Sequence, residues 1–224
     1  MSGEPEDLRS RILSRSADLF AARGYHATGL TVLLDEVGVA RGGFYHHFKS
    51  KEEVLLEIVS GTINRILVSS SAIVDQQLDP DTTLRMLCDD LSQAITTNQP
   101  GFVVFLREYS ALGLEAKERV LALRRSYLDR WEGVLEDGAR TGRFVARATP
   151  YTEGILGMWI YSFAWNRGPV EPATIAADLA DFVLRGVRTG AGPSARIAES
   201  AGHPPRRRRG VATGSRPKQD GGAA

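Results

Sequence analysis

The amino-acid sequence predicts an all-α protein with about nine helices. Three observations predict this class: apolar residues recur at alternating spacings of three and four, no segment alternates apolar and polar residues as a strand would, and several segments open on helix-capping residues. Such spacing places apolar side chains on one face of a helix, where a neighbouring helix buries them. We therefore expect helices packed on helices, without a sheet.

Start and stop signals place several of these helices. The first is closed by Gly24, and another opens at Asp79, which suits a helix cap, with Pro80 at the first helical position. That helix ends near Asn98, and later helices are expected over residues 115–139, over 152–165 and after Glu171. The stripes that define them are Ile12, Leu13, Ser16, Leu19 and Phe20; Leu84, Leu87, Cys88, Leu91 and Ile95; Val120, Leu123, Tyr127, Leu128, Trp131, Val134 and Leu135; and Ile175, Leu179, Phe182, Val183 and Gly186.

Composition is that of an ordinary globular protein. The chain has 224 residues and a net charge of +1, but residues 191–224 alone carry +5, so that the other 190 residues sum to −4. Binding to nucleic acid would therefore depend on a local group of donors and not on an overall basic field. Cys88 is the single cysteine, which excludes an internal disulfide or a CxxC zinc or redox motif. We expect it to be a small core residue.

The chain is expected to stay in the cytoplasm. No stretch approaches the roughly 18 uninterrupted apolar residues of a membrane span, and the acidic start lacks the apolar region of a signal peptide. The expected domains are a disordered N-terminus at 1–7, a helix-turn-helix at 8–53, a larger helical domain at 54–188 and a disordered basic tail at 189–224. The tail contains Arg206–Arg209 and either keeps the protein soluble or attracts phosphates without sequence specificity.

Residues 28–53 have the spacing of a helix-turn-helix. A short helix over 28–37, a turn at Gly38 and a second short helix over 41–48 are followed by Ser50-Lys-Glu-Glu53, which predicts a capping box at the start of the next helix. Phe44 and Phe48 lie four residues apart and are expected to face the core with Leu33, Val37 and Val39. The opposite face would present cationic, aromatic and minimal side chains, which suit close approach to a phosphate backbone.

At this point the chain resembles the DNA-binding domain of the TetR family. The resemblance covers residues 8 to about 58 and is carried by Leu19-Phe-Ala-Ala-Arg-Gly-Tyr-His-Ala-Thr28 and by Val37-Gly-Val-Ala-Arg-Gly-Gly-Phe-Tyr-His-His-Phe-Lys-Ser-Lys-Glu-Glu53. It implies that Thr28 and Lys51 hold phosphates and that helical residues after the turn enter the DNA groove. The DNA-contacting residues that we expect are Thr28, Thr31, Arg41, Gly42, Gly43, Tyr45, His46 and Lys51.

Three positions depart from the family, which usually has Ser or Thr where this chain has Gly29, Ala40 and Gly43. Ala40 removes the expected cap of the recognition helix, worth roughly 0.5 to 2 kcal/mol. The Gly42-Gly43 pair makes that helix intrinsically weak. A metal site at His46 and His47 is not expected, because neighbours on a helix point about 100° apart and no acidic or sulfur partner is near.

The resemblance implies that the larger domain binds a small effector among its middle helices and forms a four-helix dimer interface with its last two. Aromatic side chains offer an apolar wall for the effector: Phe102, Phe105, Tyr109, Tyr127, Trp131 and Trp159. The expected interface residues are Phe163, Leu179, Phe182, Val183 and Gly186. Each aromatic also fits plain core packing.

The segment Met158–Pro172 is similar to repressors that sense acyl-CoA thioesters, and an aromatic hydrophobic compound fits the same wall. Arg107, Arg124 and Arg125 are candidates for CoA phosphates, although a solvated helix face explains them equally.

The predicted function is a homodimeric repressor that binds palindromic operator DNA and is released by a small effector. A helical interaction module without DNA binding and a TetR-type activator are the alternatives. The chain has no HExxH, Walker, GxSxG or dinucleotide-binding glycine motif, so we expect no enzyme, cofactor or metal, and no membrane partner.

Overall fold

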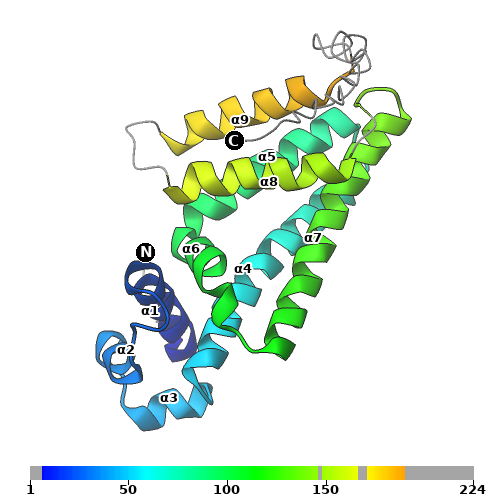
Figure 1. Ribbon diagram of the computed structural model, residues 1–224. Helices are drawn as coiled ribbons and strands as arrows, with labels where there is room; N and C mark the ends of the chain where they lie inside the picture. The colour runs from blue at the N-terminus through cyan, green and yellow to red at the C-terminus, as the bar shows by residue number, and fades with distance from the viewer. Residues whose placement is uncertain (1–6, 146–147, 166–170, 190–224) are drawn as a thin grey trace, which may run out of the picture. The chain divides into compact units, whose positions relative to one another are not determined.

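The computed structural model describes residues 7–145, 148–165 and 171–189 (Figure 1). The all-α prediction is confirmed: within these ranges the only pairing of extended backbone is an isolated bridge between Phe144 and Arg188. The helices in chain order are α1 (Leu8–Arg23), α2 (Leu30–Val37), α3 (Arg41–His47), α4 (Lys51–Val74), α5 (Pro80–Thr97), α6 (Gln99–Glu108), a 3-10 turn (Tyr109–Ala111), α7 (Leu114–Arg140), α8 (Ala148–Trp165) and α9 (Pro172–Val187).

Most helix ends follow the sequence signals. Gly24 stops α1 with a φ of 87°, and Gly38 stops α2 with a φ of 70°, a left-handed conformation that glycine adopts without steric penalty. Asp79 caps α5 by accepting the backbone N–H of Thr82 at 3.3 Å. However, α2 begins at Leu30 and not at Thr28, because Thr28 N–H donates to Tyr25 in a turn that precedes the helix.

The capping box at the start of α4 is confirmed in one half and shifted in the other. Ser50 Oγ accepts the backbone N–H of Glu53 at 3.1 Å, as predicted. The Glu53 carboxylate, however, accepts the backbone N–H of Lys49 at 2.5 Å, one residue earlier than a reciprocal box requires. The junction between α3 and α4 is thus held by side chains from the start of α4 itself.

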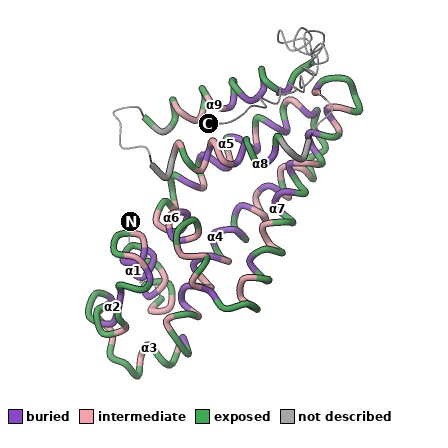
Figure 2. Tube along the Cα trace, in the orientation of Figure 1, coloured by how far each residue is buried: buried purple, intermediate pink, exposed green. Residues whose placement is uncertain are grey.

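Two apolar clusters form the core, and α4 runs through both of them (Figure 2). The N-terminal cluster joins buried residues of α1, α2, α3 and α4 as far as Ile63 with Val104, Leu112 and Val120. The C-terminal cluster joins α4 from Ile66 onward with buried residues of α5, α7, α8 and α9. By length and composition alone α4 could cross a membrane, but its apolar face is the face that contacts α1, α5, α6 and α7.

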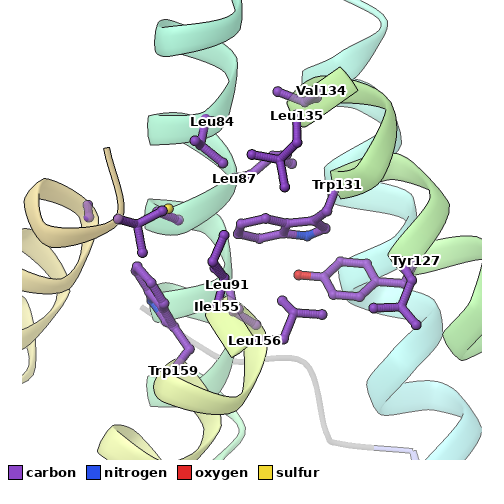
Figure 3. Close-up of a cluster of buried hydrophobic side chains, with 14 of the residues drawn as sticks. Leu84, Leu87, Leu91, Tyr127, Trp131, Val134, Leu135, Ile155, Leu156 and Trp159 are labelled. Atoms are coloured by element: carbon purple, nitrogen blue, oxygen red, sulfur yellow. The ribbon is translucent and has the colours of Figure 1, made fainter. Parts of the chain in front are cut away.

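Aromatic rings fill the centre of the C-terminal cluster (Figure 3). Trp131 and Trp159 are both fully buried, and the indole N–H of Trp159 donates to Ser92 Oγ at 2.6 Å. Cys88 lies in the same cluster, as predicted, and burial raises the pKa of its thiol. A buried thiol of this kind acts as a small apolar side chain.

The structure can be compared with one of the predicted domain limits, the one at residue 53. The limit at residue 53 falls within the first turn of α4, so a single helix belongs to both expected domains. The expected disordered segments lie outside the described residues, apart from Asp7 and Thr189 at their inner ends.

The fold makes a prediction at Gly138, near the end of α7. A Cβ atom there would lie 2.0 Å from Cδ2 of Phe144, which is itself buried. Gly138→Ala should lower the free energy of unfolding by about 1 to 3 kcal/mol, because the ring has no room to move away. Urea denaturation followed by circular dichroism measures this.

Gly133 on the same helix is the matched control, since it is exposed and a Cβ there meets nothing within 4 Å. Gly133→Ala should raise the free energy of unfolding by roughly 0.5 to 1 kcal/mol through helix propensity. If the two variants changed the free energy of unfolding equally, the Phe144 ring would accommodate a Cβ at position 138 without loss of stability.

Candidate nucleic-acid interface and ligand cavity

The helix-turn-helix rests on a small aromatic core. Phe44 and Phe48 are 0% and 1% exposed, and their ring centroids lie 5.9 Å apart beneath α3. Leu33 and Val37 of α2 are buried in the same cluster. The predicted inner face of the two short helices is therefore confirmed, and it fixes which side chains of α3 point outward.

The outward face of α3 is cationic and aromatic. Arg41 and His46 are exposed, and Tyr45 is 51% exposed although its ring stays in edge contact with Phe44. Gly42 is also exposed, with open space where a Cβ would be. Thr31 on α2 is exposed as well. The exposed side of α3 is a surface that the backbone or groove of a duplex can approach. We call it the α3 face, and it consists of Arg41, Gly42, Tyr45 and His46.

Lys51 is placed differently from the other predicted DNA contacts. Its Nζ donates to the carbonyl oxygens of Tyr25 at 2.8 Å and Thr28 at 2.7 Å, and it lies 4.1 Å from the centroid of the Tyr25 ring. Desolvation lowers the pKa of Lys51, while the nearby carboxylate of Glu108 acts in the opposite direction. Lys51 thus ties the start of α4 to the turn between α1 and α2.

Thr28 is fully buried, and its hydroxyl donates to the carbonyl of Gly24 at 2.8 Å. This placement corrects the expectation that its side chain holds a phosphate. The side chain is enclosed and does not reach solvent, and the family resemblance alone did not distinguish the two roles.

Two of the three departures from the family pattern, Ala40 and Gly43, lie at the start of α3 and within it. Ala40 makes no side-chain cap to the helix, as expected. A Cβ on Gly43 would lie 2.8 Å from Cγ2 of Val39 and 3.8 Å from Cδ2 of Leu8. Gly43 is therefore half-buried against α1 and the turn, and its small size serves packing within the chain. It does not belong to the α3 face.

The larger part of the chain contains a cavity of about 230 Å³ that side chains of α4, α5, α6, α7 and α8 line. It lies where the two core clusters meet, since Ile63 belongs to one and Ile66 to the other. Its lining comprises Ile63, Ile66, Leu91, Phe102, Phe105, Leu106, Arg124, Tyr127, Glu153, Leu156, Gly157, Ile160 and Tyr161.

Three of the six predicted ligand-binding aromatics line this cavity: Phe102, Phe105 and Tyr127. The other three are not part of its lining. Tyr109 packs edge-on to Phe105 at 6.4 Å on the side of the N-terminal cluster, and Trp131 and Trp159 are enclosed in the C-terminal cluster. The aliphatic lining escaped sequence reasoning, because a leucine beside a cavity has the same spacing as a leucine in the core.

Among the described residues that line the cavity, the two charged side chains neutralise each other, because Arg124 and Glu153 form an ion pair at 2.5 Å. Arg125 pairs instead with Asp129 on its own helix at 3.2 Å. Two other hollows, of about 320 and 660 Å³, are open grooves lined mainly by polar side chains of α1, α4, α5 and the start of α6.

Several contacts connect the cavity helices to the helix-turn-helix. Asn98, just before α6, donates to Thr62 of α4 at 3.1 Å. Beyond the far end of α6, the carboxylate of Glu52 in α4 accepts the backbone N–H of Gly113 at 2.9 Å. Arg107 donates to the carbonyl of Ala21 in α1 at 3.3 Å. Helix α6, which contributes Phe102 and Phe105 to the cavity, is thus attached to both α1 and α4.

The predicted dimer residues lie on α8 and α9 in different environments. Phe182 is 63% exposed and Gly186 is exposed with open space around it, whereas Leu179 is half-buried. Val183 is 3% exposed within the single chain, which corrects its assignment as an interface contact, because it packs in the C-terminal cluster. The side chain of Phe163 lies outside the described residues.

Comparison with known proteins agrees with this architecture. Residues 12–58 match the model of bacterial regulatory proteins of the tetR family, and residues 77–187 match a tetracyclin repressor-like C-terminal domain. The chain is 32% identical over 187 residues to the HTH-type transcriptional repressor KstR2 of Rhodococcus jostii, covering 80% of this chain and 90% of that protein.

Solved structures give the same result. The ketosteroid transcriptional regulator KstR2 of Mycobacterium tuberculosis superposes with a TM-score of 0.75 at 26% identity, covering 84% of this chain and 98% of that one. The TetR family regulator PfmR of Thermus thermophilus gives a TM-score of 0.73 at 29% identity, covering 78% of this chain and 97% of that one. The chain therefore belongs to the TetR family of transcriptional regulators.

Proposed function

We propose that this protein acts in the cytoplasm as a homodimer that binds palindromic operator DNA through the α3 face and is released when a small apolar effector fills the cavity between the two core clusters. One observation carries the proposal: the helix that opens behind the α3 face, α4, also lines the cavity. Recognition of DNA and binding of an effector would therefore act on one rigid element.

The chemistry of the α3 face supports contact with a duplex. Arg41 supplies a permanent cation, and Tyr45 and His46 supply hydrogen-bonding groups on rigid rings. Gly42 leaves the helix surface low enough for a phosphate backbone to approach closely. A helical interaction module would not need this combination of groups on a single exposed face.

The contacts of α6 support a mechanism for release. An effector that enters the cavity presses on Phe102 and Phe105 of α6 and on Ile63 of α4. A packed interior does not absorb such a change locally, so the helices shift as units. Because α6 is joined to α1 through Arg107 and to α4 through Asn98 at its start, the shift would change the placement of the α3 face relative to that of the partner subunit.

The cavity favours an effector with a compact apolar part. Its lining is largely aliphatic and aromatic, with Arg124 as the one cation among the described lining residues. An acyl-CoA thioester with its acyl group inside, or an aromatic hydrophobic compound, fits this character. The sign of regulation depends on where the operator lies, so a TetR-type activator is distinguished by a reporter assay of transcription.

Selection from random duplex DNA tests the proposal directly. The retained sequences should be palindromes whose half-sites lie about one helical turn apart, roughly 34 to 36 Å, because a two-fold dimer presents two α3 faces. Sequencing of the bound pool measures the spacing. A pool without a shared palindrome would contradict sequence-specific binding by a dimer.

Arg41→Ala should weaken operator binding and reduce the slope of log affinity against log salt concentration by about one, because one phosphate neutralisation is lost. Fluorescence anisotropy of a labelled selected duplex at several salt concentrations measures both. Arg65→Ala is the matched control, since Arg65 is an exposed arginine of α4 outside the α3 face. It should leave the slope unchanged.

Lys51→Ala separates a structural from an electrostatic role in the same assay. Its ammonium already bonds to Tyr25 and Thr28, so the variant should lower the unfolding midpoint and the operator affinity while the salt slope stays the same. A slope reduced by about one, with an unchanged midpoint, would instead make Lys51 a phosphate ligand.

Phe182→Arg should convert the dimer to monomers, since it places a charge on the exposed aromatic position of α9. Sedimentation velocity at micromolar concentration measures the mass. Val68→Arg on α4 is the matched control, because Val68 is 62% exposed and belongs to neither α8 nor α9, and this variant should remain dimeric. A dimeric Phe182→Arg protein would move the interface elsewhere.

A further inference from the structure

Two buried polar atoms beside the cavity have no hydrogen-bond partner of acceptable geometry among the described residues: the hydroxyl of Tyr127 and the indole N–H of Trp131. They lie one turn apart on α7, with ring centroids 6.2 Å apart. Tyr127 is 4% exposed and Trp131 is fully buried, so solvent does not satisfy either atom. Buried polar groups in folded proteins are paired as a rule, and each exception calls for a cause.

In the same cluster, the indole N–H of another buried tryptophan, Trp159, does have a hydrogen-bond partner. Trp159 donates its N–H to Ser92 at 2.6 Å, and Ser92 in turn donates to the carbonyl of Cys88. This core therefore provides a partner for one of these two tryptophans. Figure 3 shows the Tyr127 hydroxyl directed toward the Trp131 indole, with Leu156 beside it. The two polar atoms are gathered at one point among aliphatic side chains.

Tyr127 and Trp131 lie beside the cavity, where they could donate hydrogen bonds to a bound ligand. Tyr127 lines the cavity together with Leu91 and Leu156, and its hydroxyl marks the end of the ring that faces Trp131. Burial raises the pKa of Tyr127, while a poorly aligned hydrogen bond from the Trp131 side chain acts against that rise. The phenol is therefore neutral and can donate its proton, as the Trp131 N–H can. Two donors at one point suit a single acceptor oxygen.

We propose that Tyr127 and Trp131 form a subsite that binds one neutral acceptor oxygen, such as a ketone or ester carbonyl, on an otherwise apolar effector. This inference rests on the effector cavity of the proposed function. The hydroxyl is covered in this structure, so binding requires the lining beside Tyr127 to open until the oxygen reaches both donors. Trp131 then keeps its N–H oriented from the adjoining core.

The character of the cavity lining favours a neutral acceptor oxygen over a charged one. Moving a carboxylate into an apolar cavity is unfavourable unless a cation meets it. Arg124, the cation of the described lining, is already paired with Glu153 at 2.5 Å. A carbonyl oxygen carries no net charge, and two donors satisfy both of its lone pairs.

Binding of two probes that differ by one oxygen tests the subsite. The probes are decalin and 2-decalone, and the full-length protein is titrated with each by displacement of a solvatochromic dye. Tyr127→Phe removes only the hydroxyl. It should weaken 2-decalone binding by roughly threefold to tenfold, the range expected for one hydrogen bond, and leave decalin binding unchanged. Tyr109→Phe is the matched control, because Tyr109 does not line the cavity, and it should leave both affinities unchanged.

Thermal unfolding without probe supplies a second measurement. Since the Tyr127 hydroxyl has no partner of acceptable geometry among the described residues, Tyr127→Phe should keep or raise the unfolding midpoint. A lowered midpoint would show that the hydroxyl is already bonded within the core, and it would overturn the proposal. So would equal weakening of both probes, or of neither.

The outcomes also separate this inference from the function on which it rests. If both probes bind and the variant treats them alike, the cavity remains an effector site and only the oxygen subsite is wrong. If neither probe binds the wild-type protein, the cavity does not accept ligands, and both proposals for it fail. Binding of the selected operator, measured in parallel, would still stand on the α3 face.

Discussion

The structure depends on the burial of one continuous helix, α4, in two separate places. Its first half completes the core beneath the helix-turn-helix, and its second half, from Ile66, completes the core of the larger part. Because α4 is one continuous helix of 24 residues, its two halves share one register and cannot be turned independently about its axis. The register of the apolar stripe along α4 therefore sets how both cores are built, and the cavity forms at the point where one core ends and the other begins.

The first turn of α4 concentrates the contacts that transmit this constraint. Lys51 holds the carbonyls of the turn after α1, and Glu52 holds the backbone N–H of Gly113 at the entrance to α7. Ser50 caps α4 itself, and Glu53 holds the backbone N–H of Lys49 after α3. Three consecutive residues, Lys51, Glu52 and Glu53, thus connect α4 to three other parts of the fold. Their charges lie at the N-terminus of a long helix, where the carboxylates are favoured by the dipole and the lysine is tolerated because carbonyl oxygens receive it.

Sequence reasoning succeeded where local rules determine the structure and failed where distant residues decide. Helix periodicity, Gly24, Gly38 and the cap at Asp79 predicted the elements, because each acts over one or two turns. Thr28 and Val183 were misplaced, because their burial depends on partners that the local pattern does not contain. The resemblance identified the exposed residues of α3, but it could not show that the ammonium of Lys51 bonds to carbonyl oxygens.

Helix α7 shows why the cavity in particular escapes prediction. Tyr127 and Trp131 occupy the same apolar stripe, and spacing alone treats them as equivalent. In the fold Tyr127 lines a cavity, whereas Trp131 is enclosed in the C-terminal cluster. What distinguishes the pair is visible only in three dimensions, in two donors that have no well-formed hydrogen bond among the described residues. A core that satisfies Trp159 and leaves its neighbours unsatisfied gives up stability at one place, and such a local loss is typical of a site kept for binding.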